Sequence, residues 1–147
     1  FRSTLCKPTV LRARQRHAQA QVDGVWWIWP ADDNPASRRH ASRAQADVVR
    51  LLAPFDPVVW DRRRFALLWG WDYRFEAYTP APKRVRGYYA LPLLWRDRVI
   101  GWGNLAVKDG VLVPDIGYVA GSAPDDAGYP AALDDELQRM AAFLGVG

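Results

Sequence analysis

The sequence is poor in the residue types from which disulfide frameworks and most metal sites are built. Among 147 residues it has one cysteine, Cys6, and two histidines, His17 and His40, which are not at metal-ligand spacing. A single cysteine excludes an internal disulfide and a cysteine-based zinc cluster. We therefore expect no metal site, with Cys6 as an inert thiol and both histidines in surface or packing roles.

Long apolar runs and glycine-rich phosphate loops are also missing. No run approaches the roughly 20 apolar residues that cross a bilayer. The basic beginning "FRSTLCKPTVLRARQRH" lacks the apolar segment of a signal peptide. The segment "GWGNLAV" lies in a strand-like run and opens no helix, so it predicts no phosphate site. We expect a cytoplasmic protein with no cofactor and no membrane partner.

Hydrophobic residues, in contrast, are plentiful. Half of the residues are hydrophobic, 13% are aromatic and eight are Trp, which is enough to form a core without disulfides or metals. The length fits one ordinary domain, or a small domain with a fragment of a neighbour.

Charge is distributed unevenly along the chain, whose net charge is +4. Residues 1–108 hold 19 of the 20 Lys and Arg, whereas the last 39 residues hold seven of the 16 Asp and Glu. A basic body is typical of proteins that bind nucleic acid, and an acidic tail should lie away from phosphates. Ordinary solvated surfaces in both parts are the alternative interpretation.

Turn-forming residues indicate the structure of the first part of the chain. The dipeptide Asp23-Gly24 favours a tight turn, so residues 17–29 are predicted to form a β-hairpin. Residues 35–47 are polar and alanine-rich and are predicted to be a connection. This connection separates an N-terminal segment, residues 1–34, from a domain over residues 48–147.

The domain is predicted to begin with a buried strand and a short helix. The strand starts near Val48 and must stop at two prolines, which cannot donate hydrogen bonds to a sheet. Asp56 or Asp61 can cap a helix near residues 57–69. Gly70 ends this helix.

Strands and a final helix are predicted for the rest of the domain. Four β-rich segments are separated by turns, at residues 72–80, 87–95, 98–107 and 110–121. Such consecutive strands favour a small antiparallel β-barrel or a strongly curved sheet, because closure removes exposed edges. The last segment of the chain is predicted to be an amphipathic helix ended by Gly145, with its apolar face at Leu133, Leu137, Met140, Ala141 and Leu144. The predicted fold is α+β and mainly β.

Residues 48–101 resemble a known family. The run "VVRLLAPFDPVVWDRRRFALLWGWDYRFEAYTPAPKRVRGYYALPLLWRDRVIG" is similar to the C-terminal part of the winged-helix, crosslink-repair DNA glycosylases (YcaQ-like proteins). The resemblance implies a C-terminal β-barrel attached to tandem winged helices, in an enzyme that excises alkylated bases, including crosslinked ones, from DNA. It also implies that the N-terminal hairpin is left over from a winged-helix unit.

Two departures from the family pattern matter. The family's catalytic Gln-x-Gln or Gln-x-Asp segment lies ahead of the matched part, and Gln19-Ala20-Gln21 is interpreted as an exposed polar pattern on a hairpin strand. The family's charged "GR-D" segment reads "GWGN" here, at residues 101–104. We therefore predict no catalytic residue in this chain, and no activity from this chain alone.

Two basic clusters are the candidate DNA-binding residues. Lys83, Arg84 and Arg86 lie on a predicted loop and can present cations to consecutive phosphates. Arg62, Arg63 and Arg64 lie on the predicted helix, where at most two can face one partner. A solvated or structural role is the alternative for both clusters. Base stacking is possible for six aromatic residues, which are predicted instead to fill the core: Trp69, Trp71, Tyr73, Tyr88, Tyr89 and Trp95.

Two functions remain open at this point. The chain is either the C-terminal DNA-contacting and scaffolding portion of a repair glycosylase, or a free-standing, non-catalytic module that binds DNA or protein. The expected partners are the phosphates of double-stranded DNA and, in the first case, the family's winged-helix region, absent from this chain. A homodimer is a further expectation, because a domain without its neighbour exposes apolar surface.

Overall fold

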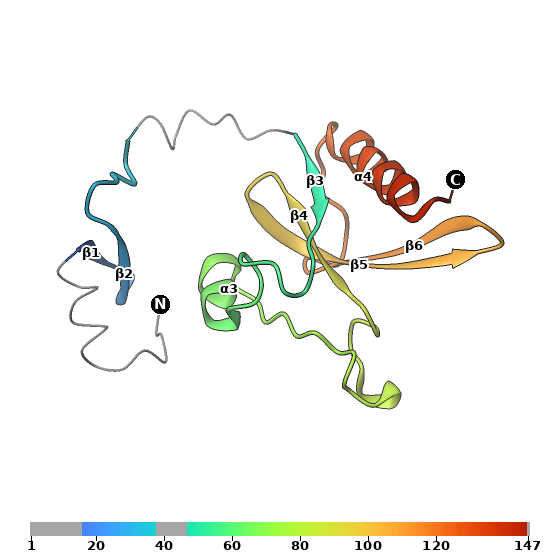
Figure 1. Ribbon diagram of the computed structural model, residues 1–147, viewed down its shortest axis with the longest axis horizontal. Helices are drawn as coiled ribbons and strands as arrows, with labels where there is room; N and C mark the ends of the chain where they lie inside the picture. The colour runs from blue at the N-terminus through green and yellow to red at the C-terminus, as the bar shows by residue number, and fades with distance from the viewer. Residues whose placement is uncertain (1–15, 38–46, 147) are drawn as a thin grey trace. The chain divides into compact units, whose positions relative to one another are not determined.

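The computed structural model describes residues 16–37 and 47–146, which fall into two compact units, Phe1–Ala44 and Gln45–Gly147 (Figure 1). In the first unit β1 (His17–Val22) and β2 (Val25–Pro30) pair antiparallel. Asp23 and Gly24 between them have φ angles of 50° and 75°, as a two-residue hairpin turn requires. The predicted hairpin is confirmed.

The second unit is built on one antiparallel sheet with strand order β3-β4-β5-β6. Its turns are those that the sequence predicts, because the dipeptides at β4–β5 and β5–β6 contain residues with positive φ, Arg96 and Asp109. The strands are β3 (Val49–Leu51), β4 (Leu91–Trp95), β5 (Arg98–Lys108) and β6 (Val111–Tyr118). The helices are α3 (Arg62–Trp69), the 3₁₀ helix η1 (Ala81–Lys83) and α4 (Tyr129–Leu144).

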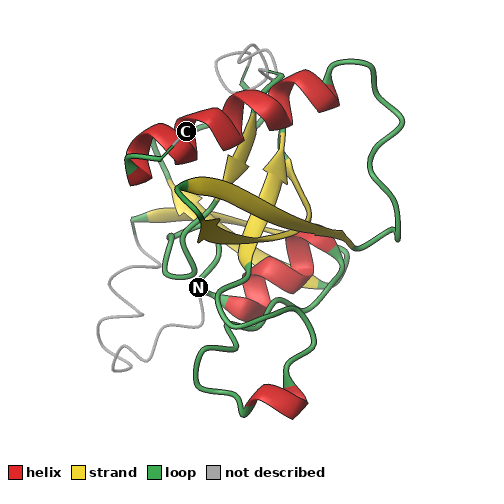
Figure 2. Cartoon of the chain, turned by 90° about the vertical axis from the view of Figure 1, so that its right-hand side faces the viewer, coloured by secondary structure: helices red, strands yellow, loops and turns green. Residues whose placement is uncertain are grey.

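Helices cover both faces of this sheet (Figure 2). Successive strand residues point to opposite faces, and β4 therefore serves two cores. Leu93 and Trp95 pack with Tyr129 of α4. Leu94 and Val99 belong to the core around Phe65 of α3. This double burial explains the unbroken apolar sequence of β4.

The helix predicted near residues 57–69 is shorter than expected. The Asp56 carboxylate accepts the Val58 N–H at 2.8 Å and closes a separate turn. The helix begins only at Arg62, after Asp61 accepts the Arg64 N–H at 3.1 Å. Gly70, with φ 74°, ends it as predicted. Two successive aspartates thus cap two successive structures, and only the second is a helix.

Residues 72–80 and 87–90 were predicted as strand, and this prediction is wrong. Tyr73 is buried between the exposed Asp72 and Arg74, as in a strand, but the alternation breaks at Glu76, which is also buried. The side chains, however, are fixed by hydrogen bonds to other segments and not by a sheet ladder. The Tyr73 hydroxyl donates to the Ala90 carbonyl at 2.8 Å.

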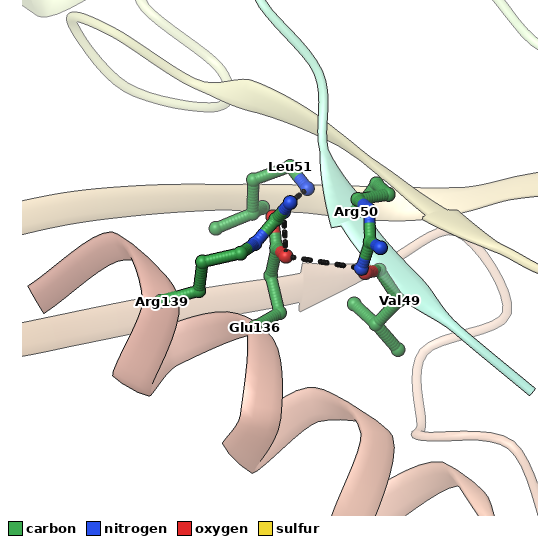
Figure 3. A network of polar contacts seen from close by, with 5 residues as sticks. All are labelled: Val49, Arg50, Leu51, Glu136 and Arg139. Atoms are coloured by element: carbon green, nitrogen blue, oxygen red, sulfur yellow. Dashed lines mark hydrogen bonds and ion pairs between the residues drawn. The ribbon is translucent and has the colours of Figure 1, made fainter. Parts of the chain in front are cut away.

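The sheet does not close into a barrel, so that part of the predicted fold is wrong, although the fold is α+β as expected. Closure is unnecessary at β3 because α4 lies beside this edge strand (Figure 3). The Glu136 carboxylate accepts the Leu51 N–H at 2.7 Å, and the Arg50 guanidinium donates to the Val49 carbonyl at 2.7 Å. The free edge of β3 is therefore hydrogen-bonded without another strand.

The predicted C-terminal helix is confirmed, and its inward face begins earlier than predicted. Tyr129, Ala132 and Glu136 are buried, Leu133, Leu137, Met140 and Ala141 of the predicted face are half-buried, and Leu144 is exposed. Gly145, with φ 68°, ends the helix. Among the helices of the described residues, none has both the length and the apolar character to span a membrane.

Candidate nucleic-acid interface

The arginine triplet of α3 is divided by the helix into exposed and engaged members. Arg62 and Arg63 are exposed. Arg64 is half-buried, and its guanidinium donates to the Pro57 carbonyl. Successive helix residues point in different directions, so one arginine supports the preceding turn while two remain available to a partner.

The second basic cluster lies on a loop that is organised by one buried carboxylate. Glu76 is 3% exposed. Its Oε2 accepts the backbone N–H groups of Val85 at 2.9 Å, Arg86 at 2.8 Å and Gly87 at 3.3 Å. Three consecutive donors around one anion form a compact nest. This nest determines the course of the basic loop.

The electrostatics of the nest favour the charged carboxylate. Burial by itself would raise the pKa of Glu76, but the N–H groups of Arg86, Val85 and Gly87 lower it, and so does the Arg86 guanidinium. The net effect lowers the pKa of Glu76 below its ordinary value. Glu76 therefore stays ionised and keeps the loop closed at neutral pH.

Lys83 and Arg84 present their charges differently. Lys83 is exposed at the end of η1 and has no ion-pair partner within residues 16–37 and 47–146. The Arg84 Nε donates to the Thr79 carbonyl at 2.8 Å. Its guanidinium carbon lies 4.9 Å from the centre of the Tyr88 ring. The Arg84 side chain is thus held by Thr79 and Tyr88, whereas the Lys83 side chain is exposed.

Arg86 lies against two neighbouring indole rings, whose centres are 6.5 Å apart. Its guanidinium carbon lies 5.1 Å from the ring centre of Trp71 and 5.4 Å from that of Trp102. Asn104 Nδ2 donates to the Arg86 carbonyl at 2.7 Å. Trp102 and Asn104 belong to the "GWGN" segment that departs from the family pattern, and they hold the basic loop against β5.

Tyr73 is buried in the core around Phe65 of α3. Burial is the main cause that raises the pKa of the Tyr73 phenol, and Tyr89 adds to it. Arg86 of the loop and Arg62 of α3 both oppose this rise. The basic loop reaches α3 through ring contacts, because Arg86 lies over Trp71 and the Trp71 ring centre is 4.9 Å from that of Phe65 in α3.

Two buried acids, Glu76 and Glu136, were not expected from the sequence. Neither was named as a candidate residue, and Glu136 was counted only in the acidic tail. The Glu136 carboxylate accepts a hydrogen bond from the Leu51 N–H and forms ion pairs with Arg50 and Arg139 (Figure 3). The spacing of Glu136 in the sequence indicated that it is buried, because residues 129, 132, 133 and 136 share the helix face that packs inward.

The remaining predictions have mixed outcomes. Gln19 and Gln21 are exposed on β1, as expected. No group of three metal-ligating side chains occurs in the described parts of the chain. Cys6, His40 and most of the connection at residues 35–47 lie outside the described residues.

The six aromatic residues do not all fill the core as predicted. Tyr73 and Trp95 are buried, and Trp69 and Trp71 pack against the core around Phe65. Tyr88 and Tyr89 are instead 59% and 49% exposed. The prediction is wrong for these two because the chain before β4 does not pair in the sheet.

A family model matches most of the sequence. The sequence model of a family described as "DNA glycosylase AlkZ-like" matches residues 5–143. No solved structure matches the chain.

Proposed function

The chain belongs to the AlkZ-like DNA glycosylase family, and we propose that it forms the DNA-contacting and scaffolding portion of a repair enzyme that excises alkylated or crosslinked bases. By the resemblance described above, the catalytic winged helices lie ahead of the matched part. The role of this chain is then to bind duplex phosphates beside the site of excision.

One observation carries this proposal beyond family membership. Between Tyr73 and Arg96 the only acidic residue is Glu76, and it is buried in the nest. The exposed charges of this stretch are therefore all positive, including Arg74 and Lys83. A surface with this charge favours phosphate contacts, which supply most of the affinity for duplex DNA.

Six residues are proposed to form the interface, with two kinds of role. Lys83, Arg62, Arg63 and Arg84 contact phosphates. Arg64 and Arg86 are engaged within the protein and keep α3 and the basic loop in place.

Salt-dependent binding tests the interface. We expect Arg62→Ala, Arg63→Ala and Lys83→Ala together to weaken binding to a duplex oligonucleotide and to reduce the salt slope by about one for each cation removed. The measurement is fluorescence anisotropy at several salt concentrations. The matched control is Arg98→Ala with Lys108→Ala, two exposed cations of β5. An equal loss per cation removed in the two variants would mean that net charge alone, and not this surface, determines binding.

Base excision distinguishes the glycosylase from the alternative function. A free-standing, non-catalytic module would bind duplex DNA in the same way. We expect no release of an alkylated base by this chain alone, and release once the winged-helix region of a family member is supplied with it. Binding without excision in that combined assay would favour the non-catalytic module.

A further inference from the structure

A group of aromatic rings lies exposed beside the basic loop. Four of them have more than ordinary exposure for aromatic residues: Phe55 at 72%, Tyr78 at 90%, Tyr88 at 59% and Tyr89 at 49%. Phe55, Tyr78 and Tyr89 form, with Phe75, what we call the aromatic platform, and Tyr88 precedes Tyr89 in the sequence. The aromatic platform belongs to the segments on either side of α3, between β3 and β4 (Figure 1).

Phe75 is the centre of the aromatic platform and anchors it to the core. Its ring is partly buried and packs against the core around Phe65. The ring centres of Phe55, Tyr78 and Tyr89 lie 5.6 Å, 6.2 Å and 5.1 Å from that of Phe75. All three contacts are edge-to-face, with interplanar angles of 68°, 84° and 89°.

This geometry leaves ring faces available. An edge-to-face contact covers at most one of the two faces of a ring, and the high exposure of Phe55 and Tyr78 shows that little else covers them. The rings are gathered around one anchored residue and are not scattered singly over the surface. A cluster of this kind points to a partner with flat apolar groups.

Several cations lie close in sequence to the residues of the aromatic platform. The Arg84 guanidinium lies over Tyr88, and Lys83 is exposed next to it in the sequence. Arg74, between the core residue Tyr73 and Phe75, is also exposed. The only acid of this stretch, Glu76, is buried and occupied by three backbone donors.

We propose that the aromatic platform stacks the bases of unpaired DNA, while Lys83 and Arg84 contact the phosphates of the same strand. Single-stranded nucleic acid is the partner that combines flat apolar groups with a regular negative charge, and proteins bind it with aromatic rings interleaved with cations. In a paired duplex the base faces are covered by stacking, so duplex phosphates alone would not account for the exposed rings. The inference rests on the proposed DNA-binding function and specifies which DNA structure this surface takes.

The test compares single-stranded and duplex binding by the whole chain. The probes are labelled oligothymidine of about 20 nucleotides and a duplex of the same length. We expect Phe55→Ala with Tyr78→Ala to lower affinity for oligothymidine about tenfold or more, as loss of stacked bases does, with little change for the duplex. The control is Phe143→Ala, which removes an aromatic residue of α4 that is 83% exposed and lies outside the aromatic platform.

An oligonucleotide without bases separates stacking from charge. A strand of abasic sites keeps the phosphates, so the unaltered chain should bind it more weakly than it binds oligothymidine, by at least the loss that the Phe55→Ala, Tyr78→Ala variant shows. The variant should distinguish the two strands less than the unaltered chain does, because Tyr88 and Tyr89 remain. Circular dichroism of the variant serves as the check that it folds, which we expect because both side chains are mainly exposed.

Several results would overturn the inference. The first is that the variant binds oligothymidine as well as the unaltered chain does. The second is that the variant loses as much affinity for the duplex as for oligothymidine. The third is that the unaltered chain binds the abasic strand and the normal strand with equal affinity. A loss of self-association in the variant, seen by sedimentation without a loss of DNA binding, would assign the aromatic platform to a second copy of the chain. Duplex binding without any single-strand binding would refute only this inference, whereas failure to bind the duplex would refute the proposed function.

Discussion

At the scale of single residues, the two buried glutamates, Glu76 and Glu136, accept hydrogen bonds from other segments of the chain. Glu76 receives three backbone donors and Glu136 receives one, with two guanidinium groups beside it. A buried charge is tolerated only when it is paired or hydrogen-bonded. Each glutamate therefore connects segments that are far apart in the sequence or that have no regular secondary structure.

We expect Glu76→Gln to destabilise the second unit by about 1–3 kcal/mol, because charged hydrogen bonds to three donors become neutral ones. The measurement is urea unfolding at neutral pH. The matched control is Asp72→Asn, a charge removal at an exposed position of the same segment, which should change stability by less than about 0.5 kcal/mol. If both variants are equally stable, the nest does not contribute to folding.

The lowered pKa of Glu76 predicts that the stability of the second unit depends on pH. Because the pKa of Glu76 is lowered on folding, its contribution to stability is present above the pKa of the unfolded chain and is lost as pH falls through the lower folded value. The difference between the unaltered chain and Glu76→Gln should therefore shrink on acidification. Urea unfolding repeated at decreasing pH measures it, and a constant difference would contradict this role.

At the scale of secondary-structure elements, α4 replaces the strand that would close a barrel. It packs on one face of the sheet and contacts both outer strands, β3 and β6. Pro114 on β6 is compatible with an edge strand, since proline cannot donate a ladder hydrogen bond. The edge of β3 is covered by Glu136 and Arg50.

We expect Glu136→Gln to cost about 1.5–3 kcal/mol, the range for hydrogen bonds to charged groups. The amide oxygen can still accept the Leu51 N–H, but the ion pairs with Arg50 and Arg139 are lost. Asp135→Asn, at an exposed position of the same helix, is the control. Unfolding in urea measures stability, and hydrogen exchange of the Leu51 amide reports on the edge of β3.

The amide exchange separates the two functions of Glu136. Protection of the Leu51 amide should survive in Glu136→Gln and fall in Glu136→Ala, which leaves this N–H without its acceptor. Equal protection in both variants would mean that α4 covers the edge without the help of the carboxylate.

At the scale of the whole molecule, the second unit holds both core clusters of the described residues, whose members lie between Val49 and Leu133. We expect residues 45–147 to unfold cooperatively when produced without the first unit. Near-ultraviolet circular dichroism during heating measures this. A weak, gradually fading aromatic signal would show that the domain needs residues 1–44.

The sequence by itself determined the local features of this protein. The turns at Asp23-Gly24 and Arg96-Asp97, the capping by Asp61 and the helix end at Gly145 follow from interactions within a few residues. The charge asymmetry and the family resemblance were equally visible in the sequence, because both are properties of residue order.

Only the tertiary structure decided how these parts are used. Residues 72–80 alternate like a strand, yet they have no strand partner, and their polar groups bind Ala90 and residues 85–87 instead. The burial of Glu76, the exposure of Tyr78 and the covered edge of β3 depend on contacts between distant segments. Such contacts are determined by the free energy of packing the whole domain, which no local pattern encodes.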